Sequence, residues 1–245
     1  MNNAWLLVLG ANSDIAVATA RRFAKEGWNI YLASRDMDNL AKEATNLSLR
    51  YGVDARESFF DAIDFASHHV FYDALDPKPA GIILAFGLLG DQLSAQKDFS
   101  IATKIIESNY MGAVSILEVI AHDFEVRGSG FIVGISSVAG DRGRASNYIY
   151  GSAKGGLSVY LSGLRHRLAK SNVHVMTVKP GFVATKMTAG MDLPTKLLAS
   201  PGEVAKAIYF GTLGNHNTIY VKKIWRLIML IITHIPEKIF KKTNL

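Results

Sequence analysis

The chain has 245 residues, of which 49% are hydrophobic, and this is enough for one large domain with a full core. It contains no cysteine, which excludes disulfide bonds and thiol chemistry and fits a reducing, cytoplasmic compartment. The net charge of +6 is uneven: residues 222–245 hold six Lys and Arg against one Glu, so the remainder is nearly neutral and is not expected to bind nucleic acid.

The first predicted elements form the opening of a nucleotide-binding unit. The apolar run at 5–9 predicts a strand, and residues 15–26 carry apolar and basic side chains on opposite faces, which predicts a helix. A turn between them directs backbone N–H groups and the positive end of the helix toward a pyrophosphate. The predicted dinucleotide contacts in this turn are Gly10, Asn12, Ser13 and Ile15.

Asp14 is unusual in such a turn. The expected pattern is Gly-x-x-x-Gly-x-Gly, and Asp14 and Ala16 occupy its second and third glycine positions. A carboxylate beside a pyrophosphate would repel it. We therefore expect Asp14 to be the helix N-cap, with its carboxylate pointing away from the phosphates.

The second predicted strand, at 29–33, ends where an adenosine ribose would lie. Ser34 and Arg35 follow it, and an arginine here favours the 2′-phosphate of NADP, whereas NAD sites usually place a carboxylate at this point. NADP(H) is thus the preferred cofactor, NAD(H) is the alternative, and a simple loop is the structural alternative for both residues. Asp36 is expected to cap a helix over 38–50.

Two further strands are predicted to end near the cofactor. The third ends at 58–60, and Asp61, followed by Ala62, could bind the adenine amino group or be an ordinary turn carboxylate. Asp64 is expected to cap a helix over 65–75. The fourth strand covers 81–85, so Ala85 and Gly87 would lie beside the nicotinamide ribose.

A long helix is predicted over 98–126, with Asn109 among apolar neighbours in its middle. A buried amide needs hydrogen-bond partners. Asn109 is either an ordinary amide satisfied by the backbone or part of a water-holding relay beside a catalytic lysine.

Three groups that could carry out proton chemistry follow the apolar strand at 131–135. Tyr150 and Lys154 are four residues apart in a helix predicted over 148–168, so they share one face. Ser137 lies at the strand end, from which a hydroxyl can reach that face.

The last part of the body again alternates strand and helix. A strand at 173–178 ends at Pro180 and Gly181, where an open α/β sheet binds ligand. Residues 182–199 are expected to form a loop or lid, followed by a helix that begins at a capping box at Ser200 and by a strand at 219–221. We predict a doubly wound Rossmann fold in one domain, 1–221, with a mostly parallel seven-stranded sheet and helices on both faces.

Taken together, these features resemble the short-chain dehydrogenase/reductase family. They are Ser137 thirteen residues before Tyr150-x-x-x-Lys154, Asn109 in the fourth helix, the glycine turn, and the break after the sixth strand. The resemblance implies a homo-oligomeric NAD(P)-dependent oxidoreductase that converts between a ketone and an alcohol. It also implies cofactor contacts from the following residues: Tyr150, Lys154, Pro180, Gly181, Val183 and Thr185.

The resemblance further implies a catalytic tetrad. Tyr150 would be the general acid, and Lys154 would lower the pKa of its phenol and bind the nicotinamide ribose. Ser137 would hold the substrate carbonyl, and Asn109 would hold a water that links the lysine to solvent. The chain departs from the family at the glycine turn and after the fourth strand, where Ala85-Phe86-Gly87 replaces Asn-Ala-Gly. The histidines have no metal-ligand spacing, and no metal is expected.

A narrower resemblance concerns residues 136–152. Their sequence is similar to that of the 2-keto reductases that act on decaprenylphosphoryl sugars, which implies a 2-keto-sugar carried on a polyprenyl phosphate. One of Arg142 and Arg144 would then bind the phosphate, or both belong to a solvated loop. The alternatives are a reductase of another hydrophobic carbonyl, acyl or steroid-like, and a non-enzymatic nucleotide sensor or scaffold.

The tail, residues 222–245, is a separate question. Its apolar run at 224–235 is shorter than the ~20 residues that a membrane span needs. Basic residues flank the run, Trp225 lies at one end, and Ile224, Leu227, Ile228 and Ile231 share a face with Ile235. This composition is typical of a helix in an anionic membrane interface, here the inner face of the membrane. The alternative is a helix buried in a dimer or against the body.

Overall fold

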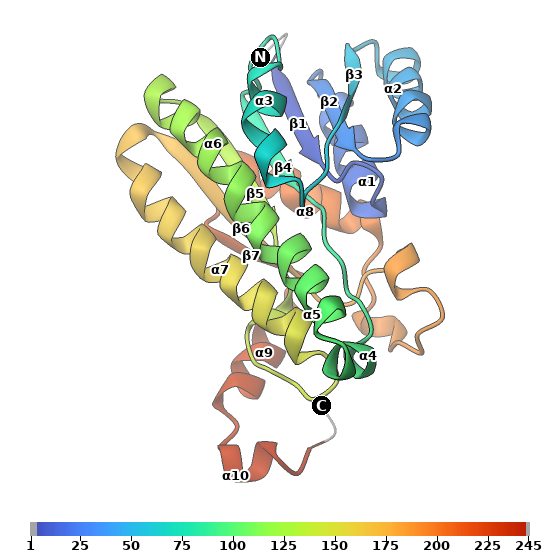
Figure 1. Ribbon diagram of the computed structural model, residues 1–245, viewed down its shortest axis with the longest axis vertical. Coiled ribbons are helices and arrows are strands. Elements are labelled where there is room, and N and C mark those ends of the chain that lie inside the picture. Colours follow the sequence, from blue (N-terminus) through green and yellow to red (C-terminus); the bar gives the residue numbers. More distant parts are fainter. Residues whose placement is uncertain (1–3, 244–245) are drawn as a thin grey trace.

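The computed structural model describes residues 4–243, and its centre is a seven-stranded sheet in the order β3-β2-β1-β4-β5-β6-β7 (Figure 1). All neighbouring strands are parallel, so the predicted doubly wound fold is confirmed. The strands are β1 (Trp5–Leu9), β2 (Asn29–Ser34), β3 (Ala55–Phe59), β4 (Gly81–Leu84), β5 (Gly130–Ile135), β6 (Val173–Pro180) and β7 (Thr218–Val221).

Helices cover both faces of the sheet. In β1, Leu7 and Leu9 pack with α6 and α7, whereas Leu6 and Val8 pack with α1, α2 and α8. Strands buried on both faces are apolar throughout, which is why the sequence shows them as continuous apolar runs. The helices are α1 (Asp14–Ala24), α2 (Met37–Tyr51), α3 (His68–Asp73), α4 (Gln92–Lys97), α5 (Phe99–Ile106), α6 (Gly112–Arg127), α7 (Tyr148–Leu168), α8 (Pro201–Leu213), α9 (Ile224–His234) and α10 (Glu237–Phe240).

The cap of α1 differs from the prediction. Ser13 has the extended backbone of an N-cap, and its Oγ accepts a hydrogen bond from Ala16 N at 3.2 Å. Asp14 is already the first helical residue, so the prediction that it caps the helix is wrong.

The other predicted caps have mixed outcomes. Asp36 caps α2 through Asn39 N, and Ser200 forms a capping box with Glu203 at α8, as predicted. Asp64 precedes the 3₁₀ turn Phe65–Ser67, but its side chain makes no capping hydrogen bond, so that prediction is wrong.

The predicted long helix over 98–126 is interrupted by a wider turn. A π-helical turn, Glu107–Met111, joins α5 to α6 and contains Asn109. Such turns often occur at functional sites, because the extra residue redirects the side chains around it. The short helix α4, which precedes α5, was not predicted.

The tail packs against the body through α9. Trp225, Met229 and Ile232 are buried in a cluster that includes Val138 and Phe182 of the body. The residues that were predicted to share one face of this helix therefore lie mostly on its outer, exposed side. Trp225 is only 4% exposed, so it is not the interfacial anchor that its position suggested. Among residues 4–243, no helix has the length and apolar character needed to cross a bilayer.

Candidate active site

A cavity of about 860 Å³ opens at the carboxyl ends of the central strands. The strand order reverses between β1 and β4, and an open parallel sheet forms a crevice at such a point. The predicted site residues that line the cavity are Asn12, Ser13, Ile15, Ala85, Gly87, Ser137, Arg144, Tyr150, Lys154, Pro180, Gly181, Val183 and Thr185.

Gly10 sets the path of the turn after β1. Its φ is +78°, and a Cβ there would lie 2.6 Å from Phe86 N, so a larger residue would clash with the backbone after β4. Its own N–H donates to Ala33 O at 2.8 Å, which joins the turn to β2. The turn is therefore held between the ends of β2 and β4.

The next residues hold the turn from both sides. Asn12 Nδ2 donates to Ser34 Oγ at 3.2 Å and to Asp36 O at 3.0 Å, while Ser13 Oγ donates to Ala85 O at 3.3 Å. The N-terminus of α1 is thus fixed at the cavity wall. An N-terminus in this position offers backbone N–H groups and partial positive charge to a phosphate.

Asp14 connects this turn to the lid segment, residues 182–199. Its Oδ2 accepts a hydrogen bond from Lys186 N at 2.7 Å, across 172 positions of the chain. The carboxylate is thereby occupied by the lid, where Thr185 and Thr188 cap the short helical turn Lys186–Thr188. No local sequence signal could have indicated this contact.

The adenosine end of the predicted site is more open. The side chain of Arg35 is 69% exposed and its Nη1 lies 3.9 Å from Asp61 Oδ2, an exposed pair of little energetic weight. Asp61 Oδ1 accepts from Ile63 N at 3.1 Å, as a turn carboxylate does. Ala62 O lies against Gly112, where a Cβ would come within 2.1 Å of it.

Ser137, Tyr150 and Lys154 come together in the cavity as predicted. The Ser137 hydroxyl lies near the phenol of Tyr150, close enough to oppose part of the rise in its pKa. Lys154 Nζ donates to Ile135 O at 3.0 Å and lies 5.8 Å from the centroid of the Tyr150 ring. The loop after β5 can pack directly against α7 because Gly140 has no side chain. A Cβ at Gly140 would lie only 2.6 Å from Gly155 N.

Burial shifts both titratable groups toward their neutral forms. It raises the pKa of Tyr150 to about 12, which the nearby Ser137 hydroxyl only partly opposes, and it lowers the pKa of Lys154 to about 8. The expected lowering of the phenol pKa by Lys154 is not seen: burial is the main cause of the shift, and Ser137 is the group that opposes it. At neutral pH the phenol keeps its proton.

Asn109 is buried and bonded to the backbone. Its Nδ2 donates to Leu88 O at 2.6 Å and Ile105 O at 2.8 Å, and its Oδ1 accepts from Leu88 N at 3.3 Å. A Cβ at Gly87 would meet both Asn109 Oδ1, at 2.6 Å, and Lys154 Nζ, at 3.3 Å. The geometry is that of a backbone-satisfied amide next to the lysine, and the water relay stays a prediction.

The two arginines of the loop at 136–147 have different surroundings. Arg142 Nη1 donates to Ile232 O at 2.6 Å and Ile235 O at 2.7 Å. Its guanidinium also lies 3.7 Å from the Phe240 ring. These tail contacts occupy Arg142, so Arg144 is the one of the two arginines that stays available for a substrate phosphate, and that role stays a prediction. Arg144 lines the cavity.

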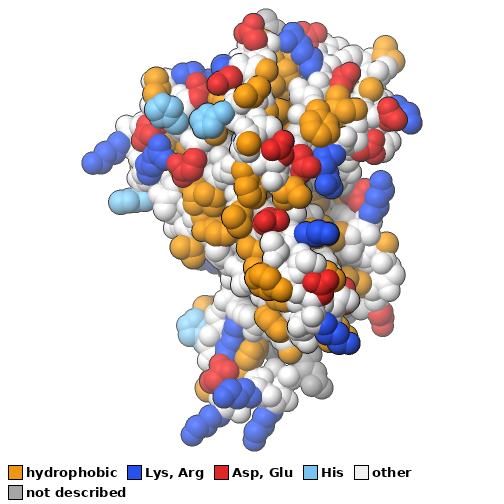
Figure 2. Space-filling view, in the orientation of Figure 1, with side chains coloured by type: hydrophobic (Ala, Val, Ile, Leu, Met, Phe, Trp, Pro, Cys, Tyr) orange, Lys and Arg blue, Asp and Glu red, His pale blue; other side chains and the backbone are white. Residues whose placement is uncertain are grey.

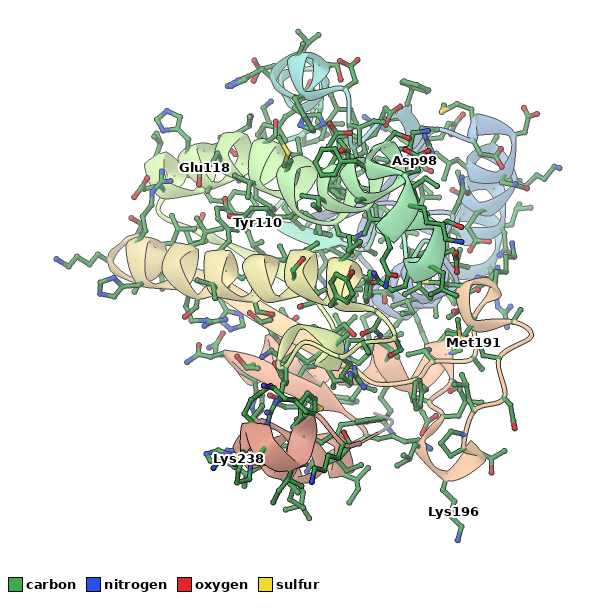
Figure 3. The ribbon with its side chains drawn as sticks, turned by 60° about the horizontal axis from the view of Figure 1, so that its bottom comes forward. Asp98, Tyr110, Glu118, Met191, Lys196 and Lys238 are labelled. Carbon is green, nitrogen blue, oxygen red and sulfur yellow. The ribbon has the colours of Figure 1, made fainter. Side chains whose placement is uncertain are left out.

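The tail forms part of the cavity wall. Trp225 lies over Gly181, where a Cβ would come within 2.0 Å of the indole, and its Nε1 donates to Leu197 O at 3.4 Å. One residue thus joins α9 to the end of β6 and to the lid. Figure 3 shows the lid with Met191 and Lys196, and the tail with Lys238.

Comparison with known proteins establishes the family. The family model described as short chain dehydrogenase matches residues 4–194. The chain belongs to the short-chain dehydrogenase family. An uncharacterized oxidoreductase of Mycobacterium tuberculosis (strain H37Rv) is 34% identical over 240 residues, which cover 97% of this chain and 96% of that protein. Another, from Streptomyces coelicolor, is 35% identical over 243 residues, covering 97% and 94%.

The fold of the chain is also found among solved members of the short-chain dehydrogenase family. A short-chain dehydrogenase from Sphingobium yanoikuyae, solved in complex with NADPH, superposes with a TM-score of 0.82 at 24% identity. The match covers 96% of this chain and 97% of that one. The predicted family and fold are confirmed, while the narrower resemblance to reductases of decaprenylphosphoryl sugars stays a prediction.

The residues present fit the dinucleotide that the family implies. The cradle at Gly10 has no room for a side chain, and the N-terminus of α1 lies at the cavity wall. The Asp14 carboxylate is held by the lid. Within residues 4–243 there is no group of three side chains suited to hold a metal ion.

Many residues that line the cavity were not predicted as site residues, and three of them bear on its chemistry or its wall. Gln92 lies on the unpredicted α4, Asn147 precedes α7, and Trp225 was considered only as a membrane anchor. Polar residues in loops and short helices have no periodicity that would indicate a role, so no sequence signal separated them from their neighbours.

Proposed function

We propose that the protein reduces a ketone to a secondary alcohol with NADP(H). The observation that carries the proposal is a protonated phenol, Tyr150, that lines one large cavity together with Ser137 and Lys154. The bound nicotinamide would supply the hydride to the carbonyl carbon. Ser137 would donate a hydrogen bond to the carbonyl oxygen, and Tyr150 would transfer its proton to that oxygen.

Lys154 would bind the nicotinamide ribose and would assist Tyr150 until its phenolate is protonated again. Its Nζ has one protein acceptor, Ile135 O, and so keeps donors for a ribose hydroxyl. Asn109 would support the lysine indirectly. It holds the backbone at Leu88, and both Asn109 and Lys154 lie against the adjacent Gly87. After the phenol loses its proton, the ammonium would stabilise the phenolate until a proton returns.

The preference for NADP(H) rests on Arg35. The residue follows β2 and its guanidinium is exposed, with only a long contact to Asp61. A 2′-phosphate could form charge-assisted hydrogen bonds with it. Titration of NADPH and NADH against the protein and against Arg35→Ala tests this: equal affinity for NADPH in both proteins would remove Arg35 from the site and leave NAD(H) as the alternative.

For the substrate we propose a 2-keto-sugar on a polyprenyl phosphate. The cavity walls combine apolar side chains, among them Phe182, Met191 and Trp225, with the cationic Arg144. This combination suits a molecule with a polar, anionic head and a long apolar chain. A reductase of another hydrophobic carbonyl, acyl or steroid-like, uses the same apolar walls but has no need of Arg144.

We also propose that the tail rests on an anionic lipid surface at the inner face of a membrane. The outer face of α9 and α10 exposes Ile224, Leu227, Leu230, Ile231 and Ile239. Figure 2 shows Lys and Arg side chains gathered at the lower end of the molecule, where the tail lies. Exposed apolar residues rimmed by basic ones are the pattern of an interfacial helix. The same helix lines the cavity on its inner side, so a lipid-linked substrate could pass from the bilayer to the site.

The decisive experiment is an NADPH-oxidation assay with a polyprenylphosphoryl 2-ulose in anionic vesicles, with Tyr150→Phe as the inactive control. Turnover of this compound but not of long-chain acyl or steroid ketones supports the proposed substrate. The opposite selectivity would favour the second candidate. Tight NADPH binding without turnover of any ketone would favour a nucleotide sensor and refute the enzymatic proposal.

A further inference from the structure

Three residues that line the cavity carry buried polar side-chain atoms for which the described part of the chain supplies no hydrogen-bond partner. Within residues 4–243, five buried side-chain nitrogen or oxygen atoms lack a hydrogen-bond partner, and three of them belong to residues that line this one cavity. These are Gln92 Nε2, Arg144 Nε and Asn147 Oδ1. Buried polar atoms are nearly always paired in folded proteins, so a cluster of exceptions at a cavity calls for an occupant that pairs them.

The donor on Gln92 has a fixed orientation. Its Oε1 accepts a hydrogen bond from Ile149 N at 3.1 Å, and Ile149 directly precedes Tyr150. Turning the amide over would place an NH₂ group against that N–H, so Nε2 must be a donor facing away from Ile149. A free donor is thus anchored to the first turn of α7, next to the residue that is proposed to protonate the substrate.

Arg144 also lacks a partner inside the protein. The nearest carboxylate on its loop, Asp141, is already engaged by Lys179 and by the hydroxyl of Tyr220. No ion pair of Arg144 occurs within the described part of the chain. A half-buried guanidinium without a counterion is unfavourable unless a ligand supplies acceptors.

Asn147 completes the cluster from the start of α7. It occupies the N-cap position of that helix, but its side chain makes no capping hydrogen bond. Its amide therefore has both an acceptor and donors to offer to a ligand. The start of α7 thus adds a third residue with hydrogen-bonding groups to the cavity lining, after Gln92 of α4 and Arg144 of the loop at 136–147.

We propose that Gln92, Arg144 and Asn147 form a polar subsite that selects ketones bearing hydroxyl groups near the reacting carbonyl. A hydroxyl oxygen can accept from Gln92 or Arg144 while its proton is donated to the Asn147 amide. An apolar ketone leaves the three groups as unpaired as they are in the free protein, whereas each group that a hydroxylated ketone pairs strengthens its binding by about 10-fold. The inference rests on the proposed ketone reduction and narrows its substrate to the polyhydroxylated class.

The test compares two ketones of equal chain length, a 1,3,4-trihydroxy-2-ketone and the corresponding 2-ketone without hydroxyls. Binding to the NADP-loaded protein is followed by the fluorescence of Trp225, which lines the cavity, with Trp225→Phe as the spectroscopic control. Turnover is followed separately by NADPH oxidation. The wild-type protein should bind the hydroxylated ketone on the order of 100-fold more tightly, since at least two of the groups become paired.

Gln92→Met and Asn147→Ala should each reduce that preference by roughly 10-fold, mainly through KM, and leave the affinity for the apolar ketone unchanged. Gln96→Met is the matched control, because Gln96 lies exposed on the same helix and away from the cavity. Equal weakening for both ketones would show that these residues only support the local fold, and it would overturn the inference. Equal wild-type affinity for the two ketones would overturn it as well.

Failure of the proposed function would be recognised separately. Hydroxyl-selective binding without NADPH oxidation would refute ketone reduction and leave the subsite standing. Oxidation of NADPH with both ketones at equal kcat/KM would support reduction and refute the subsite.

Discussion

Lys154 should destabilise the folded protein at neutral pH, because its ammonium group is buried. The residue is 4% exposed, and burial lowers its pKa from 10.5 to about 8. In the unfolded chain the group keeps its ordinary pKa, so below pH ~8 folding must either bury the charge or release the proton. This cost in folding free energy is full below the pKa that Lys154 has in the folded protein. It decreases as the pH rises toward the pKa that Lys154 has in the unfolded chain.

The magnitude follows from the two pKa values. At about pH 6.5 the ammonium costs about 3 kcal/mol of folding free energy, and at about pH 9.5 it costs about 1 kcal/mol. Lys154→Met keeps the length of the side chain but removes the titration. It also removes the hydrogen bond to Ile135 O, a loss of ~1 kcal/mol that is the same at both pH values. The stability of Lys154→Met relative to wild type should therefore be greater at the lower pH by about 2 kcal/mol.

The assay is urea unfolding of wild-type protein and Lys154→Met without nucleotide at the two pH values. Taking the difference between the proteins cancels every group that titrates alike in both. Lys42→Met, at an exposed position of α2, is the matched control and should differ from wild type by the same amount at both pH values. A pH-independent effect of Lys154→Met, or one that is more favourable at the higher pH, would refute the buried-ammonium argument.

Three other substitutions test the remaining contacts. Tyr150→Phe should lower kcat for ketone reduction by at least ~10²-fold with little change in NADPH affinity, because it removes the acid but no cofactor charge; unchanged turnover in the NADPH assay would remove Tyr150 from the chemistry. Asp14→Ala should speed proteolysis of the lid by about 10-fold because the Lys186 N–H loses its acceptor, whereas Asp14→Asn, which keeps one, should not. Arg142→Ala should raise hydrogen exchange of α9 about 10-fold or more; unchanged exchange with a raised KM would mean that Arg142 binds substrate after all.

The sequence predicted best those elements whose burial leaves a local pattern. Helix α7 was predicted with the bounds that the structure has, 148–168, because apolar residues recur along it at helical spacing. The buried strands were visible as apolar runs. For the same reason, the sequence also predicted that three site residues lie near one another. A strand end and one face of a helix are both local features, and these place Ser137, Tyr150 and Lys154.

The contacts that the sequence did not predict join distant segments. Asp14 and Lys186 are far apart in the chain, and nothing near either residue marks the other. In the tail, apolar residues surround α9 on almost all sides, so periodicity could not tell which side would pack on the body. The structure settles this by placing Trp225 over Gly181, where the absence of a side chain makes room for the indole.

The loop at 136–147 shows why residue type alone does not assign a role. Asp141 is fixed to the sheet by Lys179 and Tyr220, and Arg142 is fixed to the carbonyl groups at the end of α9. Asp141 and Arg142 are thus held by other parts of the protein, whereas Arg144, two residues further on, lines the cavity. The tail therefore supports the loop that carries Arg144, as well as supplying Trp225 to the cavity wall. A surface that binds the outer face of α9 would act on substrate binding through these two connections.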